Sequence, residues 1–202
     1  EEPQLKFEAP KFKKKLKLPK AIENPKASGY LMARRLDPSR FYYADKFKAF
    51  ANSLKPTFDS TKYEEERIII PLYYNDNLIG FQGRSIDPNP VKYITVMLDD
   101  DAPKIYGLDT IDKNERVYIT EGPFDSTFIR NAIAMCGADA VLGDWGISNP
   151  VYVYDNEPRN REIVNRISRT IDTGDSVVIW PSHIEEKDIN DMVMNGHDVQ
   201  KL

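Results

Sequence analysis

Acidic side chains follow three of the strands that the sequence predicts. They are Glu121 after the run at 117–120, Asp155 and Glu157 after the run at 151–154, and Asp188 and Asp191 beyond the run at 176–180. In open α/β sheets ligands bind outside the carboxyl ends of the strands, so these side chains are expected to meet at one edge. Converging carboxylates repel each other unless a divalent cation lies between them. Because hard oxygen ligands suit Mg²⁺ or Mn²⁺, the pattern predicts a site for one of these metals.

Each of these acids also has a simpler interpretation. Asp155 and Asp188 are good helix caps, and Glu121 could be a turn carboxylate in water. For any one residue the simpler interpretation is favoured. Three acidic strand ends together favour the metal site, and Gly122 next to Glu121 would let the backbone approach closely.

The acids belong to a region in which strands and helices alternate. Strands are predicted at 117–120, 140–142, 151–154 and 176–180, and apolar helix faces at 128–136 and 163–171. This succession indicates an α/β domain with a compact, mostly parallel four-stranded sheet and helices packed on it. We expect this domain to span residues 115–202.

The preceding residues predict an α+β subdomain over 29–114. The segment "GYLMARRLDPSRFYYADKFKAFANSLK" is expected to be mostly helical, with Asp37 and Pro38 as the cap and first residue of a helix. "RIIIPLYYNDNLIGFQGRSI" predicts a hairpin that turns at 75–77, and "VKYITVML" predicts another strand. Residues 1–28 mix lysines with prolines without an apolar period, so we expect a basic flexible linker there.

Composition narrows the class of protein. The chain has 202 residues, 41% hydrophobic and 30% charged, with no apolar run suited to a bilayer span or a signal peptide. A single cysteine excludes an intrachain disulfide framework and a cysteine-based zinc ribbon within these residues, and it favours a reducing cytoplasm. Residues 1–67 carry 16 Lys/Arg against 10 Asp/Glu, whereas 68–202 carry 12 against 22. The basic part would attract a polyanion such as nucleic acid, and the acidic part would hold divalent cations.

Three short motifs, "TEGPFDS", "DNE" and "KDIND", resemble those of the Toprim domain of primases, topoisomerases, nucleases and recombination proteins. The Toprim pattern has D-x-D where this chain has Glu157 as the second acid, which moves the carboxylate by about one bond length. Upstream, "YLMARRLDPSRFYY", "RIIIPLYYNDNLIGFQGRSI", "KYIT" and "IYGLD" resemble, in this order, the segment before Toprim in bacterial-type replicative primases. Over roughly residues 30–196 the chain is most similar to primases of T-even-type bacteriophages.

The resemblance implies a Rossmann-like Toprim domain within a DNA primase core, which synthesises short RNA primers on single-stranded DNA by metal-dependent nucleotidyl transfer. The implied metal site, for two or more Mg²⁺ or Mn²⁺ ions, consists of Asp155, Glu157 and Asp188, with Glu121 as ligand or general base and Asp125 and Asp191 as auxiliaries. The implied groove for template and ribonucleoside triphosphates contains Arg84 and Lys92. Arg159 and Arg161, at the start of a predicted helix, would add triphosphate contacts or only face solvent.

The expected partners follow from the resemblance as well. They are single-stranded DNA, ribonucleoside triphosphates and a hexameric replicative helicase, in the cytoplasm of a host cell if the chain is viral. Primases of this kind carry a zinc ribbon, which one cysteine cannot form. We expect it upstream of Glu1, which is not a methionine, with residues 1–28 as the tether, or on another chain.

Two other functions remain open from the sequence. A Toprim nuclease would use the same metal site for phosphodiester cleavage, and an Mg²⁺-dependent nick in plasmid DNA would favour it. A non-catalytic Toprim module for DNA binding or scaffolding would bind DNA without synthesising RNA, and the substitution at Glu157 keeps this alternative open.

Overall fold

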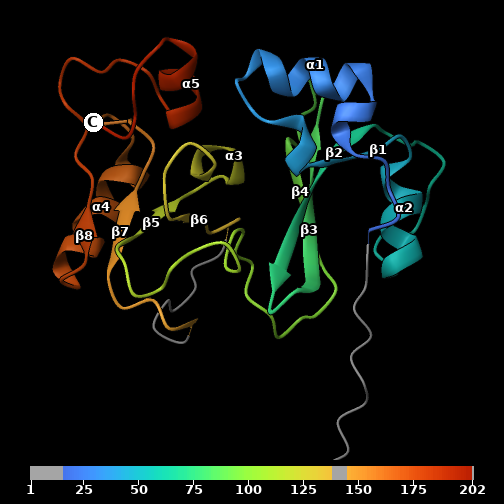
Figure 1. The fold of residues 1–202 in the computed structure, drawn as a ribbon, viewed down its shortest axis with the longest axis horizontal. Coiled ribbons are helices and arrows are strands. Elements are labelled where there is room, and N and C mark those ends of the chain that lie inside the picture. Colours follow the sequence, from blue (N-terminus) through green and yellow to red (C-terminus); the bar gives the residue numbers. More distant parts are fainter. Residues whose placement is uncertain (1–15, 138–144, 202) are drawn as a thin grey trace, which may run out of the picture.

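Two four-stranded sheets lie beside each other along the long axis of the molecule (Figure 1). The computed structural model describes residues 16–137 and 145–201. In the first half the elements are η1 (Ala21–Glu23), α1 (Pro25–Ala33), η2 (Pro38–Arg40), β1 (Tyr42–Ala44), α2 (Phe47–Leu54), β2 (Arg67–Tyr74), β3 (Asn77–Ser85) and β4 (Tyr93–Met97). In the second half they are β5 (Val117–Thr120), α3 (Pro123–Ser126), β6 (Ala132–Ala134), β7 (Pro150–Val153), α4 (Arg161–Asp172), β8 (Ser176–Val177) and α5 (Ile189–Met194). Within the two described ranges, no helix has the length and apolar character needed to cross a membrane.

A tight hairpin organises the first sheet, which is antiparallel in the order β1-β2-β3-β4. Asn75 and Asp76 join β2 to β3 with φ angles of 50° and 59°, as a two-residue turn of type I′ requires. The Asp109 carboxylate accepts hydrogen bonds from the backbone N–H groups of both turn residues at 2.8 Å. The predicted hairpin is confirmed, and a residue outside the hairpin stabilises its turn.

The folded part of the chain begins earlier than the sequence suggests. Pro25 starts α1, and the Asn24 side chain caps this helix by accepting a hydrogen bond from the backbone N–H of Ala27. Ala21 and Ala27 are fully buried. The expected linker over 1–28 therefore extends too far, because η1 and the start of α1 lie within it. The two alanines fill the core, but isolated alanines in a charged segment give no periodic signal from which a helix could be predicted.

A strand interrupts the segment that was expected to be mostly helical. The Asp37 side chain caps only the short turn η2, by accepting from the backbone N–H of Ser39. β1 then pairs with β2, with Tyr42 opposite Ile69, before α2 begins at Phe47. Aromatic residues favour a half-buried strand once a partner strand is present, and that partner comes from a distant part of the sequence.

The second sheet is parallel in the order β6-β5-β7-β8, which confirms the prediction of a parallel four-stranded sheet. The helix predicted over 128–136 is wrong, because residues 132–134 form β6 and α3 has only four residues. Asn131 and Cys136 have φ angles of 55° and 45°, which an α-helix cannot contain. The strand predicted at 140–142 lies outside the described residues. The last strand ends at Val177, earlier than predicted.

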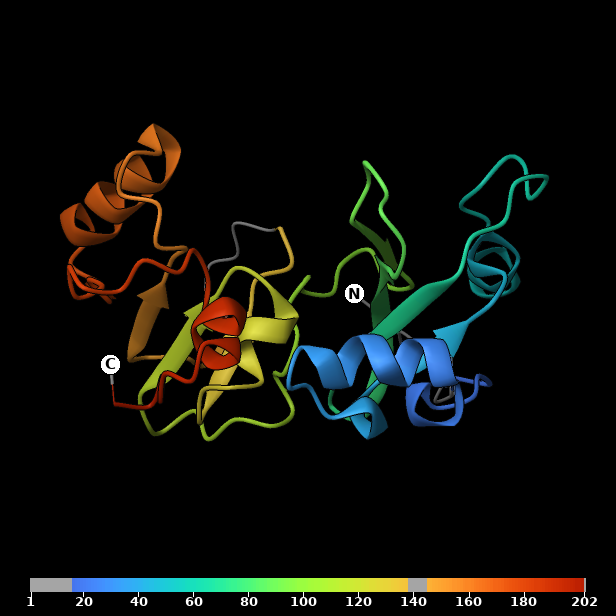
Figure 2. The same ribbon diagram turned by 90° about the horizontal axis from the view of Figure 1, so that it is seen from above.

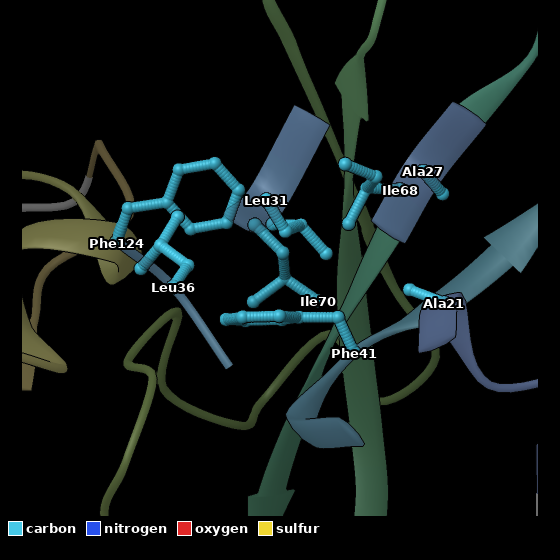
Figure 3. Close-up of a cluster of buried hydrophobic side chains, with 8 residues drawn as sticks. All are labelled: Ala21, Ala27, Leu31, Leu36, Phe41, Ile68, Ile70 and Phe124. Carbon is cyan, nitrogen blue, oxygen red and sulfur yellow. The ribbon is translucent and has the colours of Figure 1, made fainter. Parts of the chain in front are cut away.

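One aromatic side chain connects the two halves of the molecule. Phe124, from α3, belongs to a buried cluster whose other members come from the first half (Figure 3). These members are Ala21, Ala27, Leu31, Leu36, Phe41, Ile68 and Ile70. The Phe124 ring meets the Phe41 ring edge-on, with 5.3 Å between the centroids. The predicted boundary between 114 and 115 is therefore crossed by a shared core.

Candidate active site at the edge of the parallel sheet

Strand β5 ends on the first acid of the site. Glu121 follows Thr120 directly, and Gly122 begins the single turn of α3 that carries Asp125. A Cβ atom on Gly122 would lie 3.0 Å from Oδ2 of Asp125, which is tighter than ordinary van der Waals contact. Gly122 therefore allows Asp125 to fold back toward the end of the strand.

The neighbouring strand β7 delivers the next two acids, Asp155 and Glu157. The residue between them, Asn156, donates its side-chain amide to the carbonyl oxygens of Ile184 and Glu186 at 2.9 and 3.0 Å. Its backbone N–H donates to the carbonyl oxygen of Lys187 at 2.6 Å. Asn156 thus fixes the segment 184–187 beside the loop that carries both acids.

Asp188 and Asp191 follow this segment, at the start of α5. The Asp188 carboxylate caps the helix by accepting from the backbone N–H of Asp191 at 2.8 Å. The simpler interpretation is therefore correct for Asp188, although the cap also lies at the carboxylate edge. For Asp155 it is wrong, because Asn160 caps α4.

Burial and the charges of neighbouring acids raise the pKa values of three of these carboxyl groups. Burial, followed by the charge of Asp188, raises the pKa of Asp125 to about 7. Burial and the charge of Glu121 raise the pKa of Asp155 to about 6. Burial and Asp188 also raise the pKa of Asp191. Without a cation, the folded chain therefore resists full ionisation of this edge.

Two cationic side chains partly compensate this charge. The Lys187 ammonium lies 3.3 Å from Glu157 Oε2 and 3.7 Å from Asp155 Oδ2. Arg166 Nη1, from α4, lies 3.2 Å from Glu121 Oε1. That oxygen is buried and makes no hydrogen bond of good geometry, so the contact with Arg166 is an ion pair only.

The donor set suits a hard divalent cation in charge and in chemistry, because every candidate ligand is a carboxylate oxygen. Within residues 16–137 and 145–201, however, no three acidic, histidine or cysteine groups already form a metal-binding cluster. Two features indicate that this edge can accept further positive charge. One Glu121 oxygen is buried without a hydrogen bond, and the Lys187 ammonium lies between two carboxylates. The chemistry of these residues therefore fits a hard divalent cation such as Mg²⁺ or Mn²⁺.

A cluster of aromatic and cationic side chains faces the acids from the first half. Arg84 Nε donates to the Tyr30 hydroxyl at 3.0 Å, and the Arg84 guanidinium lies 4.7 Å from the ring centroid of Tyr93. The Arg34 guanidinium lies 4.9 Å from the centroid of the Tyr30 ring. These contacts hold both guanidinium groups beside aromatic rings, and a guanidinium suits bidentate contact with phosphate.

Arg34 ties this cluster to the carboxylate edge, where α1, α3 and α5 meet (Figure 2). Its Nη1 donates to Asn190 Oδ1 at 3.1 Å, and Asn190 returns a hydrogen bond to the Arg34 carbonyl oxygen at 2.8 Å. The Asn190 backbone N–H donates to Asp125 Oδ1 at 3.0 Å. The sequence assigned no role to Arg34, Tyr30 or Asn190, because their contacts join residues up to 156 positions apart.

The other predicted basic residues lie further toward solvent. Lys92 precedes β4 and has an exposed side chain, although its carbonyl oxygen accepts from buried Arg67. Arg159 and Arg161 flank the Asn160 cap of α4, and both are exposed. A role for these three side chains in binding stays a prediction.

The sequence is similar to that of one curated protein. No protein-family model matches the sequence. The DNA primase of Enterobacteria phage T4 is 34% identical over 185 residues, which make up 88% of this chain and 54% of the phage protein. The chain is therefore similar to this phage DNA primase. It spans about half the length of this primase relative.

Solved primase structures share the fold. The zinc-binding and RNA polymerase domains of the Aquifex aeolicus primase match with a TM-score of 0.64 at 20% identity, covering 89% of this chain and 55% of that chain. The E. coli primase catalytic core matches with a TM-score of 0.63 at 17% identity, covering 90% and 73%. The DnaG primase catalytic domain bound to ssDNA matches with a TM-score of 0.63 at 18% identity, covering 90% and 72%. At these identities the match to primase cores concerns the fold alone.

Proposed function

We propose that this chain is the catalytic core of a DNA primase, which joins ribonucleoside triphosphates on a single-stranded DNA template. The observation that carries the proposal is the edge where Glu121, Asp125, Asp155 and Asp188 lie close enough to repel one another, linked through Asn190 to Arg34 of the first half. Acids that hold metal ions and arginines that hold phosphates are the two components that phosphoryl transfer requires. The relationship to a phage DNA primase supports this choice among the reactions such a site could perform.

We also propose that the parallel half, residues 115–202, is a Toprim domain. Its support is the strand order β6-β5-β7-β8, with glutamate-glycine after β5 and two alternate acids after β7. The first half, residues 29–114, would then be the subdomain that forms the groove for template and triphosphate. Phe124 packs between them, so the two parts would act as one body.

In the reaction, the 3′ oxygen of one nucleotide attacks the α-phosphorus of the next, and pyrophosphate leaves. Asp155, Glu157 and Asp188 would hold the metal ions, with Asp125 and Asp191 as auxiliaries. When bound, Mg²⁺ or Mn²⁺ neutralises charge on the phosphoryl oxygens. Glu121 would serve as a further ligand or accept the proton of the attacking hydroxyl, with its Oε1 paired to Arg166 in the metal-free chain.

The arginines would bind the anionic substrates. The Tyr30 hydroxyl accepts a hydrogen bond from Arg84 Nε, and the Tyr93 ring lies beside the guanidinium, so Arg84 is held in place before a phosphate arrives. Lys92, Arg159 and Arg161 would add mobile positive charge around the groove. A hexameric helicase and a zinc ribbon on another segment or chain would be the protein partners of such a core.

The test is template-directed synthesis on single-stranded DNA with four NTPs, one of them labelled, and Mg²⁺ or Mn²⁺. Wild type is compared with Glu121→Gln, Asp155→Asn and the control Asp172→Asn, which removes an exposed carboxylate at the end of α4. We expect short RNA from wild type and from the control. The rate of RNA synthesis should fall about 10²-fold or more in the other two variants. If no RNA appears even with Mn²⁺ and added helicase, the primase proposal fails, and DNA cleavage by the same samples would favour a nuclease instead.

A further inference from the structure

The ammonium group of Lys187 occupies a distinctive place in the carboxylate edge. Its Nζ lies 3.3 Å from Glu157 Oε2 and 3.7 Å from Asp155 Oδ2, so it contacts both acids that follow β7. The side chain is 55% exposed, whereas those of Asp155 and Glu157 are 24% and 31% exposed. A flexible, largely exposed chain thus places one positive charge where two less exposed oxygens converge.

The main chain around Lys187 is held in place independently of this ammonium. The backbone N–H of Asn156 donates to the Lys187 carbonyl oxygen, and the Asn156 side chain donates to two further carbonyls, those of Ile184 and Glu186. Asn156 lies between Asp155 and Glu157 in the sequence, so the loop that carries both acids also anchors the segment that carries Lys187. The four-carbon stem can swing away while this anchor remains.

We propose that Lys187 is an internal counter-ion that competes with divalent metal for the carboxylates of Asp155 and Glu157. The inference rests on the metal site of the proposed function. The ammonium stabilises the metal-free state, because it offsets the repulsion between the acids. A divalent ion that uses the same oxygens has to displace it, so Lys187 lowers the metal affinity of the site. The displaced ammonium remains at the edge of the site, where it can reach an anionic substrate that arrives with the metal.

Direct metal binding tests this competition without DNA or nucleotides. Binding of Mn²⁺ to the full chain is measured by the electron paramagnetic resonance signal of free Mn²⁺, for wild type, Lys187→Met and Lys201→Met. Lys201 is a matched control, because it is an exposed lysine that pairs with Asp198, away from the site acids. An ion pair of this exposure contributes up to about 1 kcal/mol, so Lys187→Met should lower the dissociation constant about five-fold, with Lys201→Met unchanged.

Chemical rescue separates the ammonium from the rest of the side chain. The protein has one cysteine, Cys136, whose thiol is buried and whose pKa is raised by that burial to about 12, so it resists alkylation. Lys187→Cys can therefore be alkylated selectively. Bromoethylamine restores an ammonium at lysine length and should return the affinity for Mn²⁺ to that of wild type, whereas iodoacetamide adds a neutral group and should leave binding tight.

The outcomes are distinct. Tighter Mn²⁺ binding by Lys187→Met, reversed only by the restored ammonium, supports the competition even if no RNA synthesis is ever found. Equal or weaker binding by Lys187→Met overturns it, as does an absence of Mn²⁺ binding to both proteins. RNA synthesis by wild type with no change in the Mn²⁺ affinity of Lys187→Met would leave the proposed function standing and refute the role of Lys187.

Discussion

Replacing Asp125 by asparagine should stabilise the metal-free protein, and it should do so only at neutral and alkaline pH. Asp125 Oδ1 accepts a hydrogen bond from the backbone N–H of Asn190, and an asparagine side chain can accept the same bond. The substitution therefore keeps the packing and removes only the charge. That charge is unfavourable because the group is buried and faces Asp188 and Asp155.

The sign and size follow from the pKa of Asp125. In the folded chain the pKa is raised to about 7, whereas in an unfolded chain it is about 3.9, so the folded state binds the proton more tightly. The stabilising effect of that proton is complete below about pH 4 and is lost as the pH rises to 7. At about 1.4 kcal/mol for each tenfold change in proton affinity, the upper limit is about 4 kcal/mol. Because the repulsion is divided between Asp125 and the neighbouring acids, we expect Asp125→Asn to raise the free energy of unfolding by about 2 kcal/mol at pH 8.

Thermal unfolding in EDTA at pH 4.5 and pH 8 measures this difference. For a chain of this length, about 2 kcal/mol corresponds to a rise in Tm of roughly 4–8 °C at pH 8, and we expect little change at pH 4.5. Asp59→Asn, in an exposed loop, is the control for loss of one negative charge. Mn²⁺ should raise the Tm of wild type more than that of the variant. A variant that is less stable than wild type at pH 8 would refute the reasoning, because it would show that the Asp125 charge is already compensated.

Three further substitutions test other parts of the structure. Phe124→Ala should lower the free energy of unfolding by about 3 kcal/mol, because it leaves a cavity in the shared core, and a loss below 1 kcal/mol in denaturant titration would contradict that packing. Gly83→Ala should cost about 2 kcal/mol in the same titration, because the new Cβ would overlap the Phe47 ring, whereas Gly29→Ala, with open space around it, should not destabilise. Tyr30→Phe removes the acceptor for Arg84 Nε and should raise the KM for NTPs about five-fold with little change in kcat; an unchanged KM in steady-state synthesis would mean that Arg84 needs no such support.

The features that the sequence predicted well are those set by neighbouring residues. The β5 strand and the Glu121-Gly122 step after it are encoded within six positions, and the hairpin turn at Asn75 and Asp76 within two. The convergence of Asp155 with Glu121 could be expected as well, because parallel strands present their carboxyl ends at one edge. Local pattern and one topological rule were enough for these features.

The features that were missed depend on distant partners. The apolar residues at 132–134 fit a helix and a buried strand equally well, and only pairing with β5 decides between them. Asn190 positions Arg34, and Asn156 positions Lys187. No periodic pattern in the sequence predicts these contacts. The cap formed by Asp188 shows that a single carboxylate can serve both a helix and a site, so the two interpretations are not exclusive.

Phe124 has a consequence for modular exchange between related chains. It stands next to Asp125 in a turn of four residues, yet its ring fills a socket made by Leu36, Phe41 and other residues of the first half. In a chimaera that combines the first half of one relative with the parallel sheet of another, the side chain at position 124 would meet a cavity that fits a different side chain. The misfit would tilt α3 and displace the acid beside it, so such halves should be interchangeable only when residue 124 travels together with its socket.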